Sequence, residues 1–219
     1  MDKLAAQPTS AINIYDFDNT IYRGDASLGF YFFCLRRQPS LLRYFPYQAW
    51  YFLLYLMRVV DKTAFKSAYF VFLRGLGDTK EVVNKFWEKR FGRIKRWYLT
   101  ADHSKDVIIS ASPEFLLLPV FNELKAHKLI ATKVDAKTGI IKGNNCRGEE
   151  KVARLLEVLD GSVIESTYTD TLSDLPILGL AKNQFIVKGD KILSLKAYVS
   201  LPLLERALLT LRGRFWSRG

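Results

Sequence analysis

The sequence has few cysteines, the residues that cross-link small folds. Its 219 residues include only two cysteines, Cys34 and Cys146, which lie far apart and belong to no paired pattern. A disulfide framework or a zinc site needs several such residues at characteristic spacings, so both are excluded. This cysteine usage is typical of a reducing compartment.

Long apolar runs are also missing. The first ten residues contain no apolar segment of the kind found in a secretory signal, so we expect the mature chain to begin near its first residue. In the most aromatic region the longest uncharged run, Tyr44–Met57, is interrupted by Pro46 and Gln48. It is also shorter than the ~20 apolar residues of a membrane-spanning helix. The sequence predicts a cytoplasmic protein without a transmembrane span.

Acidic residues are scarce relative to basic ones. The chain has 33 Lys and Arg against 22 Asp and Glu, which gives a net charge of +11. Such an excess favours an anionic partner, which could be a phosphorylated metabolite, nucleic acid or the anionic face of a membrane. Charge alone does not choose among them.

Two carboxylates follow the first apolar segment. Residues 11–20, Ala-Ile-Asn-Ile-Tyr-Asp-Phe-Asp-Asn-Thr, have the short β-branched pattern of a buried strand that ends in turn-forming residues. At a strand end Asp16 and Asp18 would project from one edge, with Phe17 turned into the core between them. One carboxylate could then attack a substrate while the other handles a proton. The alternative is an ordinary polar turn.

Three later segments carry polar residues at similar positions. Ser110 ends the apolar run that starts at Val107, and Ser112-Pro113 is the expected start of the next helix, with Ser112 as its cap. Lys151 falls in the first turn of a predicted helix, where the helix dipole disfavours a cation, so we expect a compensating anion. On spacing alone an ordinary surface lysine is the alternative.

The last of these segments is a strand, Val163–Thr169, followed by two acids. Asp170 comes directly after it and Asp174 four residues later. Because acids at the ends of parallel strands converge on one edge of a sheet, they belong to the same candidate site. Asp174 could also cap the helix that begins at Leu175-Pro176. Gln184–Val187 is expected to be the last core strand.

These four stretches, in this order, resemble the motifs of the haloacid dehalogenase-like phosphatases. The similarity covers about residues 11–25 and 105–190, and is greatest to the phosphoserine-phosphatase-like branch. It implies an α/β fold with a Rossmann-like doubly wound parallel sheet and a helical cap inserted after the first strand. The implied division is a core of residues 1–24 and 101–200, a cap of residues 25–100 and a basic amphipathic tail of residues 201–219.

The resemblance also implies a mechanism. Asp16 would be the nucleophile that forms an aspartyl-phosphate, and Asp18 the general acid and base. Mg²⁺ would be held by Asp16, the main-chain carbonyl of Asp18 and Asp170, with Asp174 in support. Ser110 and Lys151 would bind the phosphoryl oxygens.

Two departures from the phosphoserine branch bear on specificity. Ala111-Ser112 stands where a Gly-Gly pair is common, which alters the floor of the pocket. Asp25 stands near the position of a longer acid that holds the substrate's amino group, so amino-acid specificity does not carry over directly. Asp25 could instead cap a helix.

The region 28–73 holds fifteen of the chain's thirty aromatic residues and a single acid, Asp61. Rings interleaved with cations are typical of an interfacial helix pair on anionic lipid, and equally of a helical cap with an aromatic core and a solvated basic face. The cations in question are Arg36, Arg37, Arg43, Arg58, Lys62 and Lys66.

This region and the tail favour a membrane-borne phosphomonoester as substrate. The cap also resembles, more weakly, that of bacterial phosphatidylglycerophosphate phosphatases. We therefore expect a protein on the inner face of the membrane, held peripherally, with the tail as a second contact or as a disordered end. The alternatives are a soluble phosphatase of the phosphoserine type and a non-catalytic module for anionic lipid or nucleic acid. The intact carboxylates argue against the module, and nucleic acid is the least favoured partner.

Overall fold

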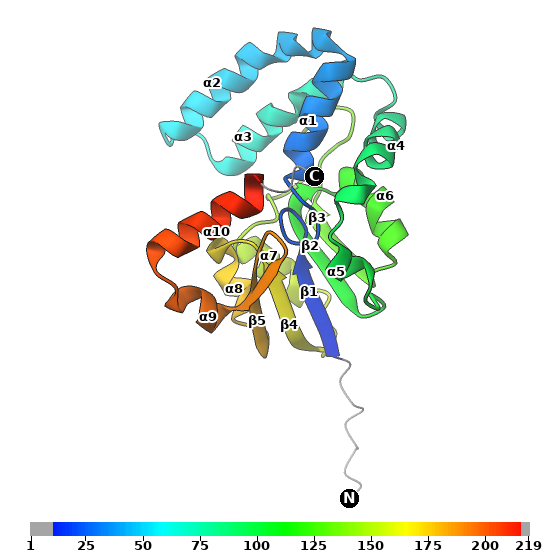
Figure 1. The fold of residues 1–219 in the computed structure, drawn as a ribbon. Coiled ribbons are helices and arrows are strands. Elements are labelled where there is room, and N and C mark those ends of the chain that lie inside the picture. Colours follow the sequence, from blue (N-terminus) through cyan, green and yellow to red (C-terminus); the bar gives the residue numbers. More distant parts are fainter. Residues whose placement is uncertain (1–10, 216–219) are drawn as a thin grey trace, which may run out of the picture.

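One mixed sheet organises the described part of the chain. The structure, a computed structural model, describes the backbone of residues 11–215 and the side chains of residues 11–211. Within these residues six strands form a sheet in the order β3-β2-β1-β4-β5-β6, in which the first five are parallel and β6 is antiparallel (Figure 1). The strands are β1 (Ala11–Asp16), β2 (Asp106–Pro113), β3 (Lys128–Thr132), β4 (Val163–Thr169), β5 (Asn183–Lys188) and β6 (Lys191–Ser194).

Both faces of the sheet are buried. Side chains alternate along each strand, so successive residues pack on opposite faces. Ile14 of β1 packs with Leu155 on one face, whereas Tyr15 packs with Leu117 on the other. The predicted doubly wound α/β sheet is therefore confirmed. The prediction that Gln184–Val187 is the last strand is wrong, because the chain turns back and adds β6 to the edge of β5.

Helices fill the connection between β1 and β2, as the predicted insertion requires. The first helices of this connection lie beyond the carboxyl ends of the strands, whereas its last helix lies beside the sheet (Figure 1). Asp25 begins this segment, and its carboxylate accepts a hydrogen bond of 2.8 Å from the amide of Leu28. The helical elements here are α1 (Ala26–Arg37), η1 (Pro39–Tyr44), α2 (Phe45–Leu56), α3 (Lys62–Tyr69), η2 (Phe70–Gly75), α4 (Thr79–Arg90), η3 (Phe91–Arg93) and α5 (Arg96–Leu99).

The remaining helices follow β2 and pack on the sheet. No helix in the described residues is both long and apolar enough to cross a bilayer. The division of the chain into core, cap and tail stays a prediction. The elements are α6 (Glu114–Leu124), α7 (Glu149–Leu156), η4 (Leu172–Asp174), α8 (Leu175–Leu178), α9 (Leu195–Ser200) and α10 (Leu203–Phe215).

The aromatic residues of the insertion fall into two groups. Phe30, Phe70 and Phe72 are fully buried and form a core between α1 and η2. Along α2, by contrast, Phe45 and Trp50 are each 57% exposed. The insertion thus has an aromatic core, and an exposed aromatic helix lies beside it.

The predicted tail begins with helix α10. Leu203, Leu204, Leu208 and Leu211 are exposed on it, as an amphipathic segment would require. The Nε of Arg206 donates to the main-chain carbonyl of Leu201 at 3.0 Å. The tail's side chains from Arg212 onward, including Arg214, Phe215, Trp216 and Arg218, lie outside the described side chains, so a second membrane contact stays a prediction.

Candidate active site

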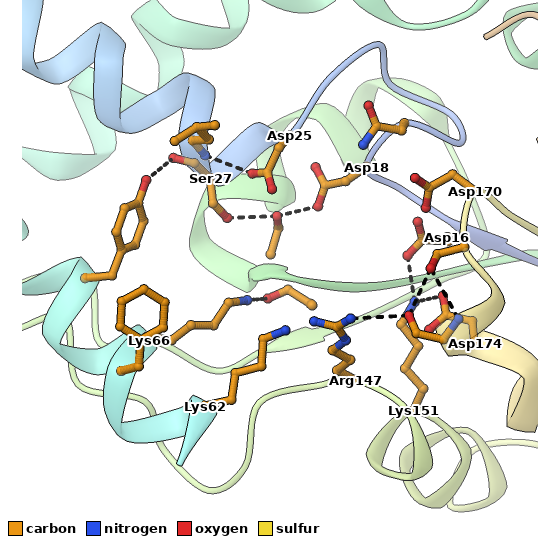
Figure 2. A pocket seen from close by; sticks show the side chains of 18 of the residues that line it. Asp16, Asp18, Asp25, Ser27, Lys62, Lys66, Arg147, Lys151, Asp170 and Asp174 are labelled. Atoms are coloured by element: carbon orange, nitrogen blue, oxygen red, sulfur yellow. Dashed lines mark hydrogen bonds and ion pairs between the residues drawn. The ribbon is translucent and has the colours of Figure 1, made fainter. Parts of the chain in front are cut away.

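A cavity of about 420 Å³ lies where the carboxyl ends of the parallel strands meet the helical insertion (Figure 2). Five acids predicted for the site, together with Lys151, line this cavity. Residues from the insertion, chiefly α3, form the opposite wall. The lining residues are Asp16, Asp18, Asn19, Asp25, Ser27, Leu28, Lys62, Phe65, Lys66, Tyr69, Phe70, Ala111, Ser112, Arg147, Lys151, Asp170, Thr171, Ser173 and Asp174.

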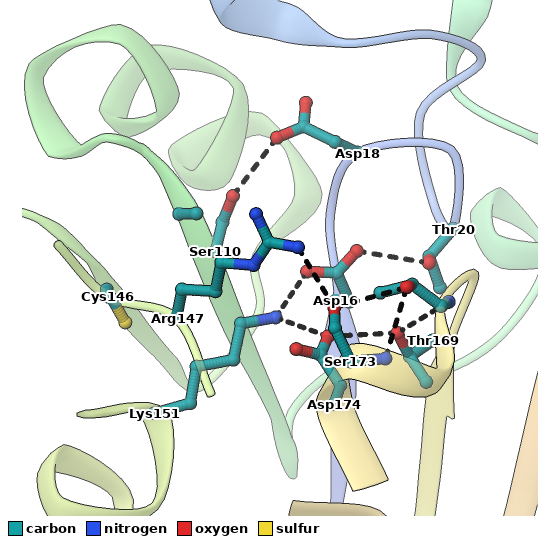
Figure 3. Close-up of polar contacts among 12 residues, drawn as sticks. Asp16, Asp18, Thr20, Ser110, Cys146, Arg147, Lys151, Thr169, Ser173 and Asp174 are labelled. Atoms are coloured by element: carbon teal, nitrogen blue, oxygen red, sulfur yellow. Dashed lines mark hydrogen bonds and ion pairs between the residues drawn. The ribbon is translucent and has the colours of Figure 1, made fainter. Parts of the chain in front are cut away.

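Lys151 has the compensating anions that its position demanded. It is 2% exposed, and its Nζ donates to Asp16 Oδ1 at 2.6 Å and to Asp174 Oδ2 at 2.7 Å (Figure 3). Burial disfavours the charged lysine, but the two carboxylates outweigh it and raise the pKa of Lys151. Lys151 is therefore a fixed cation beside Asp16.

Asp16 ends β1 and is nearly buried. Its Oδ2 accepts a hydrogen bond from Thr20 Oγ1 at 3.2 Å. Burial raises the pKa of Asp16 to about 7, and the charges of Asp174 and Asp170 act in the same direction against that of Lys151. Asp16 and Asp174 thus share one ammonium group, and the charge of Asp170 also acts on Asp16.

Asp18 is held at the other side of the cavity. Its Oδ1 accepts from the amide of Ala26 at 2.7 Å, and its Oδ2 accepts from Ser112 Oγ at 2.6 Å. Burial, followed by the charges of Asp25 and Asp16, raises the pKa of Asp18 to about 8. A carboxyl group with this pKa carries a proton at neutral pH and is able to give it away.

Ser112, and not only Ser110, lies at the site. Strand β2 continues past Ser110, and α6 begins at Glu114 with Pro113 at its cap and no side-chain capping bond. The prediction that Ser112 caps this helix is therefore wrong, since its hydroxyl binds Asp18 and lines the cavity. Ser110 is fully buried and lies against Asp18 at 3.3 Å (Figure 3).

Asp174 is not a side-chain cap for α8 either. No capping bond forms there, because its carboxylate is taken by Lys151 and by Thr169 Oγ1, which donates at 3.0 Å. Asp170 lines the cavity from the loop after β4, and its main-chain carbonyl accepts from Lys188 Nζ at 2.6 Å.

Asp25 is the helix cap that was one of its two alternatives, and its role toward a substrate stays a prediction. It caps α1, and it also lines the cavity close enough to Asp18 to raise the pKa of that residue. Being solvent-exposed, it stands at the mouth of the cavity rather than on its floor.

Several functional candidates were missed. Lys62 and Lys66 were expected to face either lipid or solvent, but both line the cavity. Lys66 Nζ donates to the carbonyl of Ala111 at 2.8 Å and to Asn145 Oδ1 at 3.0 Å, and burial lowers its pKa. Arg147 joins them from the loop before α7 (Figure 2). The i, i+4 spacing of the two lysines was the available signal, because it places both on one face of α3.

The site's donors suit a hard divalent cation. No group of three or more His, Cys, Asp or Glu side chains in the described residues is arranged as a ready metal cage. The expected set is different, since it combines Asp16 and Asp170 with a main-chain carbonyl, and Mg²⁺ commonly takes one or two carboxylates and keeps several waters. The excess of carboxylates over Lys151 supplies the negative charge that such an ion needs.

Residues 14–179 match the family model of the haloacid dehalogenase-like hydrolases. The chain belongs to this family. Among curated proteins, the chain is similar to Protein CicA of Caulobacter vibrioides, with 38% identity over 87 residues. That match spans 37% of this chain and 39% of CicA, which is well under half the length of the curated relative.

Solved structures of this family share the fold. A protein of unknown function from Bordetella pertussis Tohama I superposes with a TM-score of 0.65 at 19% identity, over 81% of this chain and 89% of that one. A probable phosphoserine phosphatase from Vibrio cholerae gives 0.60 at 13% identity, over 95% and 66%. These likenesses concern the fold. The family membership by itself supports the prediction of a hydrolase.

Proposed function

We propose that the protein hydrolyses phosphomonoesters through a phosphorylated Asp16. One observation carries the proposal: two carboxylates with different surroundings lie at the same cavity. Asp16 lies 2.6 Å from the ammonium group of Lys151, whereas Asp18 has a pKa raised to about 8 and no cationic hydrogen-bond partner. One group is suited to attack and the other to proton transfer.

The reaction takes two displacements at phosphorus. In the first, a carboxylate oxygen of Asp16 bonds to phosphorus while the ester P–O bond breaks, and Asp18 gives its proton to the leaving oxygen. In the second, Asp18 takes a proton from water as the water oxygen bonds to phosphorus. The bond between phosphorus and Asp16 then breaks and releases phosphate, and Asp18 again carries the proton.

Lys151 neutralises charge where the phosphoryl group is transferred. Phosphate monoesters resist attack because the nucleophile approaches a dianion, so positioning and charge neutralisation supply most of the catalysis. Arg147 and Ser112 line the same cavity and are placed to bind phosphoryl oxygens. Ser110, which the family resemblance assigns to this task, would reach the phosphate once Asp18 releases it.

A divalent cation completes the proposal. Mg²⁺ would be held by Asp16, the main-chain carbonyl of Asp18 and Asp170, with Asp174 fixing Lys151 beside them. When bound, the ion would keep Asp16 ionised and neutralise charge on the phosphoryl group.

The finer proposal concerns the substrate, which we take to be a membrane-borne phosphomonoester such as a phosphatidylglycerophosphate-like headgroup. Apolar Leu28 and Phe65 line the cavity beside cationic Lys62 and Lys66, a combination that suits a phosphate attached to an amphiphile. A soluble substrate of the phosphoserine type is the second candidate. Asp25 favours it, because this carboxylate at the cavity mouth could pair with a substrate amino group.

Phosphate release is the direct test. Purified protein with Mg²⁺ is offered p-nitrophenyl phosphate, phosphoserine, lysophosphatidate and phosphatidylglycerophosphate, and we expect turnover that Asp16→Asn abolishes. Asp160→Asn, on an exposed loop, is the matched control and should keep the parental rate. Parental activity in Asp16→Asn would overturn the mechanism, and the absence of turnover in the parental protein on every ester would leave the non-catalytic binding module as the better account.

A further inference from the structure

Helix α2 carries no charge and lies on the outside of the molecule. It is the most apolar helix of the insertion, yet Gln48 is its single buried residue. Its sequence is Phe-Pro-Tyr-Gln-Ala-Trp-Tyr-Phe-Leu-Leu-Tyr-Leu. Figure 1 shows α2 at the outer edge of the insertion, on the far side from the sheet. An apolar helix would ordinarily bury its face against other elements.

One side of α2 is firmly attached. Gln48 accepts from the Tyr31 hydroxyl at 2.7 Å and donates to the main-chain carbonyl of Tyr69, also at 2.7 Å. Tyr55 stacks on Phe65 of α3 with ring centroids 5.2 Å apart. These contacts hold α2 in a fixed orientation, so the apolar side that it exposes is a property of the folded protein.

The other sides of α2 face solvent. Trp50 is 57% exposed and Leu56 is 60% exposed. Soluble monomers seldom expose a contiguous apolar patch of this kind unless it binds something. We call the patch the α2 surface, and its members are Leu42, Phe45, Tyr47, Trp50, Phe52, Leu53, Leu56, Met57 and Val59.

The charges around the α2 surface all have one sign. No Asp or Glu occurs between residues 26 and 60, whereas Arg36, Arg37, Arg43 and Arg58 are all exposed there. The next acid, Asp61, is engaged as the cap of α3, where its carboxylate accepts from the amide of Ala64 at 2.7 Å. The patch is thus an apolar strip bordered by cations.

We propose that the α2 surface binds anionic bilayers, with the helix lying in the headgroup region. Its apolar strip would enter the boundary of the acyl chains, while the bordering arginines face lipid phosphates. A helix of 12 residues is ~18 Å long and cannot span a bilayer. A second copy of the chain fits less well, because its own arginines would face these arginines at the contact.

Binding to the bilayer does not depend on the proposed reaction, but it would bring the cavity close to a membrane-borne substrate. The cavity wall formed by Lys62 and Lys66 belongs to α3, the helix on which α2 packs. A bilayer at α2 would therefore lie near the cavity that receives the phosphate. Binding itself needs no turnover, so the inactive Asp16→Asn protein should bind vesicles as the parental protein does.

Co-sedimentation with vesicles tests the proposal. The test variant is Leu53→Glu with Leu56→Glu, which puts two charges in the α2 surface. The control is Leu118→Glu with Leu180→Glu, at leucines that are 47% and 41% exposed on α6 and after α8. Because both pairs change the net charge equally, the comparison separates position from total charge.

We expect the parental protein to bind phosphatidylglycerol vesicles at low salt, more weakly at high salt, and phosphatidylcholine vesicles poorly. The test pair should lower the affinity at least tenfold and the control pair less than twofold, and both should hydrolyse p-nitrophenyl phosphate at the parental rate. Equal losses in the two pairs, or a parental protein that stays in the supernatant, would overturn the proposal. So would a parental dimer in sedimentation velocity that only the test pair dissociates.

Discussion

The buried ammonium group of Lys95 donates a hydrogen bond of 2.6 Å to the main-chain carbonyl of Asn19. Its second bond, of 2.5 Å, goes to the carbonyl of Gly189 in the turn between β5 and β6. Lys95 is 1% exposed, and burial lowers its pKa to about 8. One side chain thus ties the end of the helical insertion to the loop that follows Asp18 and to the edge of the sheet.

Lys95→Met should therefore loosen the loop that carries Asp18. Two partly buried carbonyls lose their donor, which we expect to cost about 2–4 kcal/mol of unfolding free energy. The value of kcat should fall further than binding of inorganic phosphate does, because the loop positions a proton donor. Urea unfolding and steady-state kinetics measure the two effects. Lys80→Met, at an exposed position of α4, is the control, and equal effects in both variants would refute the role.

Lys151→Met should destabilise the protein in a manner that depends on pH. Asp16 and Asp174 would be left as buried carboxylates without a cation, at a cost of about 3–5 kcal/mol when both are ionised. Burial already raises the pKa of Asp16 above its unfolded value and Lys151 opposes this, so without Lys151 the folded state binds more protons and loses stability as pH rises. The deficit should be small at pH 5 and large at pH 8.

Urea unfolding at both pH values measures this deficit. Lys182→Met is the control, because its partner Glu165 is on the surface and such pairs contribute about 0–1 kcal/mol. A Lys151 variant with the same deficit at pH 5 and pH 8 would contradict the ion-pair account.

Asp18→Asn should remove the alkaline limb of the pH–rate profile. Activity needs Asp16 ionised, so kcat/KM should rise as pH approaches the Asp16 pKa of about 7, and Mg²⁺ will move this limb to lower pH. Activity also needs Asp18 protonated, so kcat/KM should fall above its pKa of about 8. The substitution should slow the hydrolysis of alkyl phosphates by roughly 10²–10⁴.

The choice of leaving group provides the control for Asp18. p-Nitrophenolate departs without a proton, so Asp18→Asn should slow the hydrolysis of p-nitrophenyl phosphate less than that of an alkyl phosphate. An equal loss on both esters would mean that Asp18 does not act as the acid toward the leaving group.

Asp170→Asn should raise the Mg²⁺ concentration needed for half-maximal activity by tenfold or more, with a smaller change in substrate KM. The reason is that the amide replaces a charged oxygen ligand by a neutral one. Titration of activity with Mg²⁺ measures this, and EDTA should inhibit the parental enzyme. Full parental activity in EDTA would remove the metal from the proposal.

The sequence by itself determined the catalytic edge. A β-branched run that stops at Asp16 can bury both faces only as an inner strand, and its carboxyl end must then project the acids that follow. Lys151 was predictable for a related reason, since a cation in the first turn of a helix requires an anion nearby. Local pattern and charge suggested these positions, because each inference concerned one element and its own end, but it was the ordered resemblance to the family motifs that favoured them over a polar turn and a surface lysine.

Only the tertiary structure decided which residues meet across elements. Periodicity places Lys66 on a face of α3, but nothing in its neighbourhood says that this face covers the carbonyl of Ala111. In the same way, Ser112 has the local signals of a helix cap until the longer strand β2 carries it to Asp18. The aromatic residues followed the same rule, because burial depends on which helices pack together and not on composition. Packing therefore left Phe45 and Trp50 of α2 exposed while Phe30 and Phe33 of α1 became core.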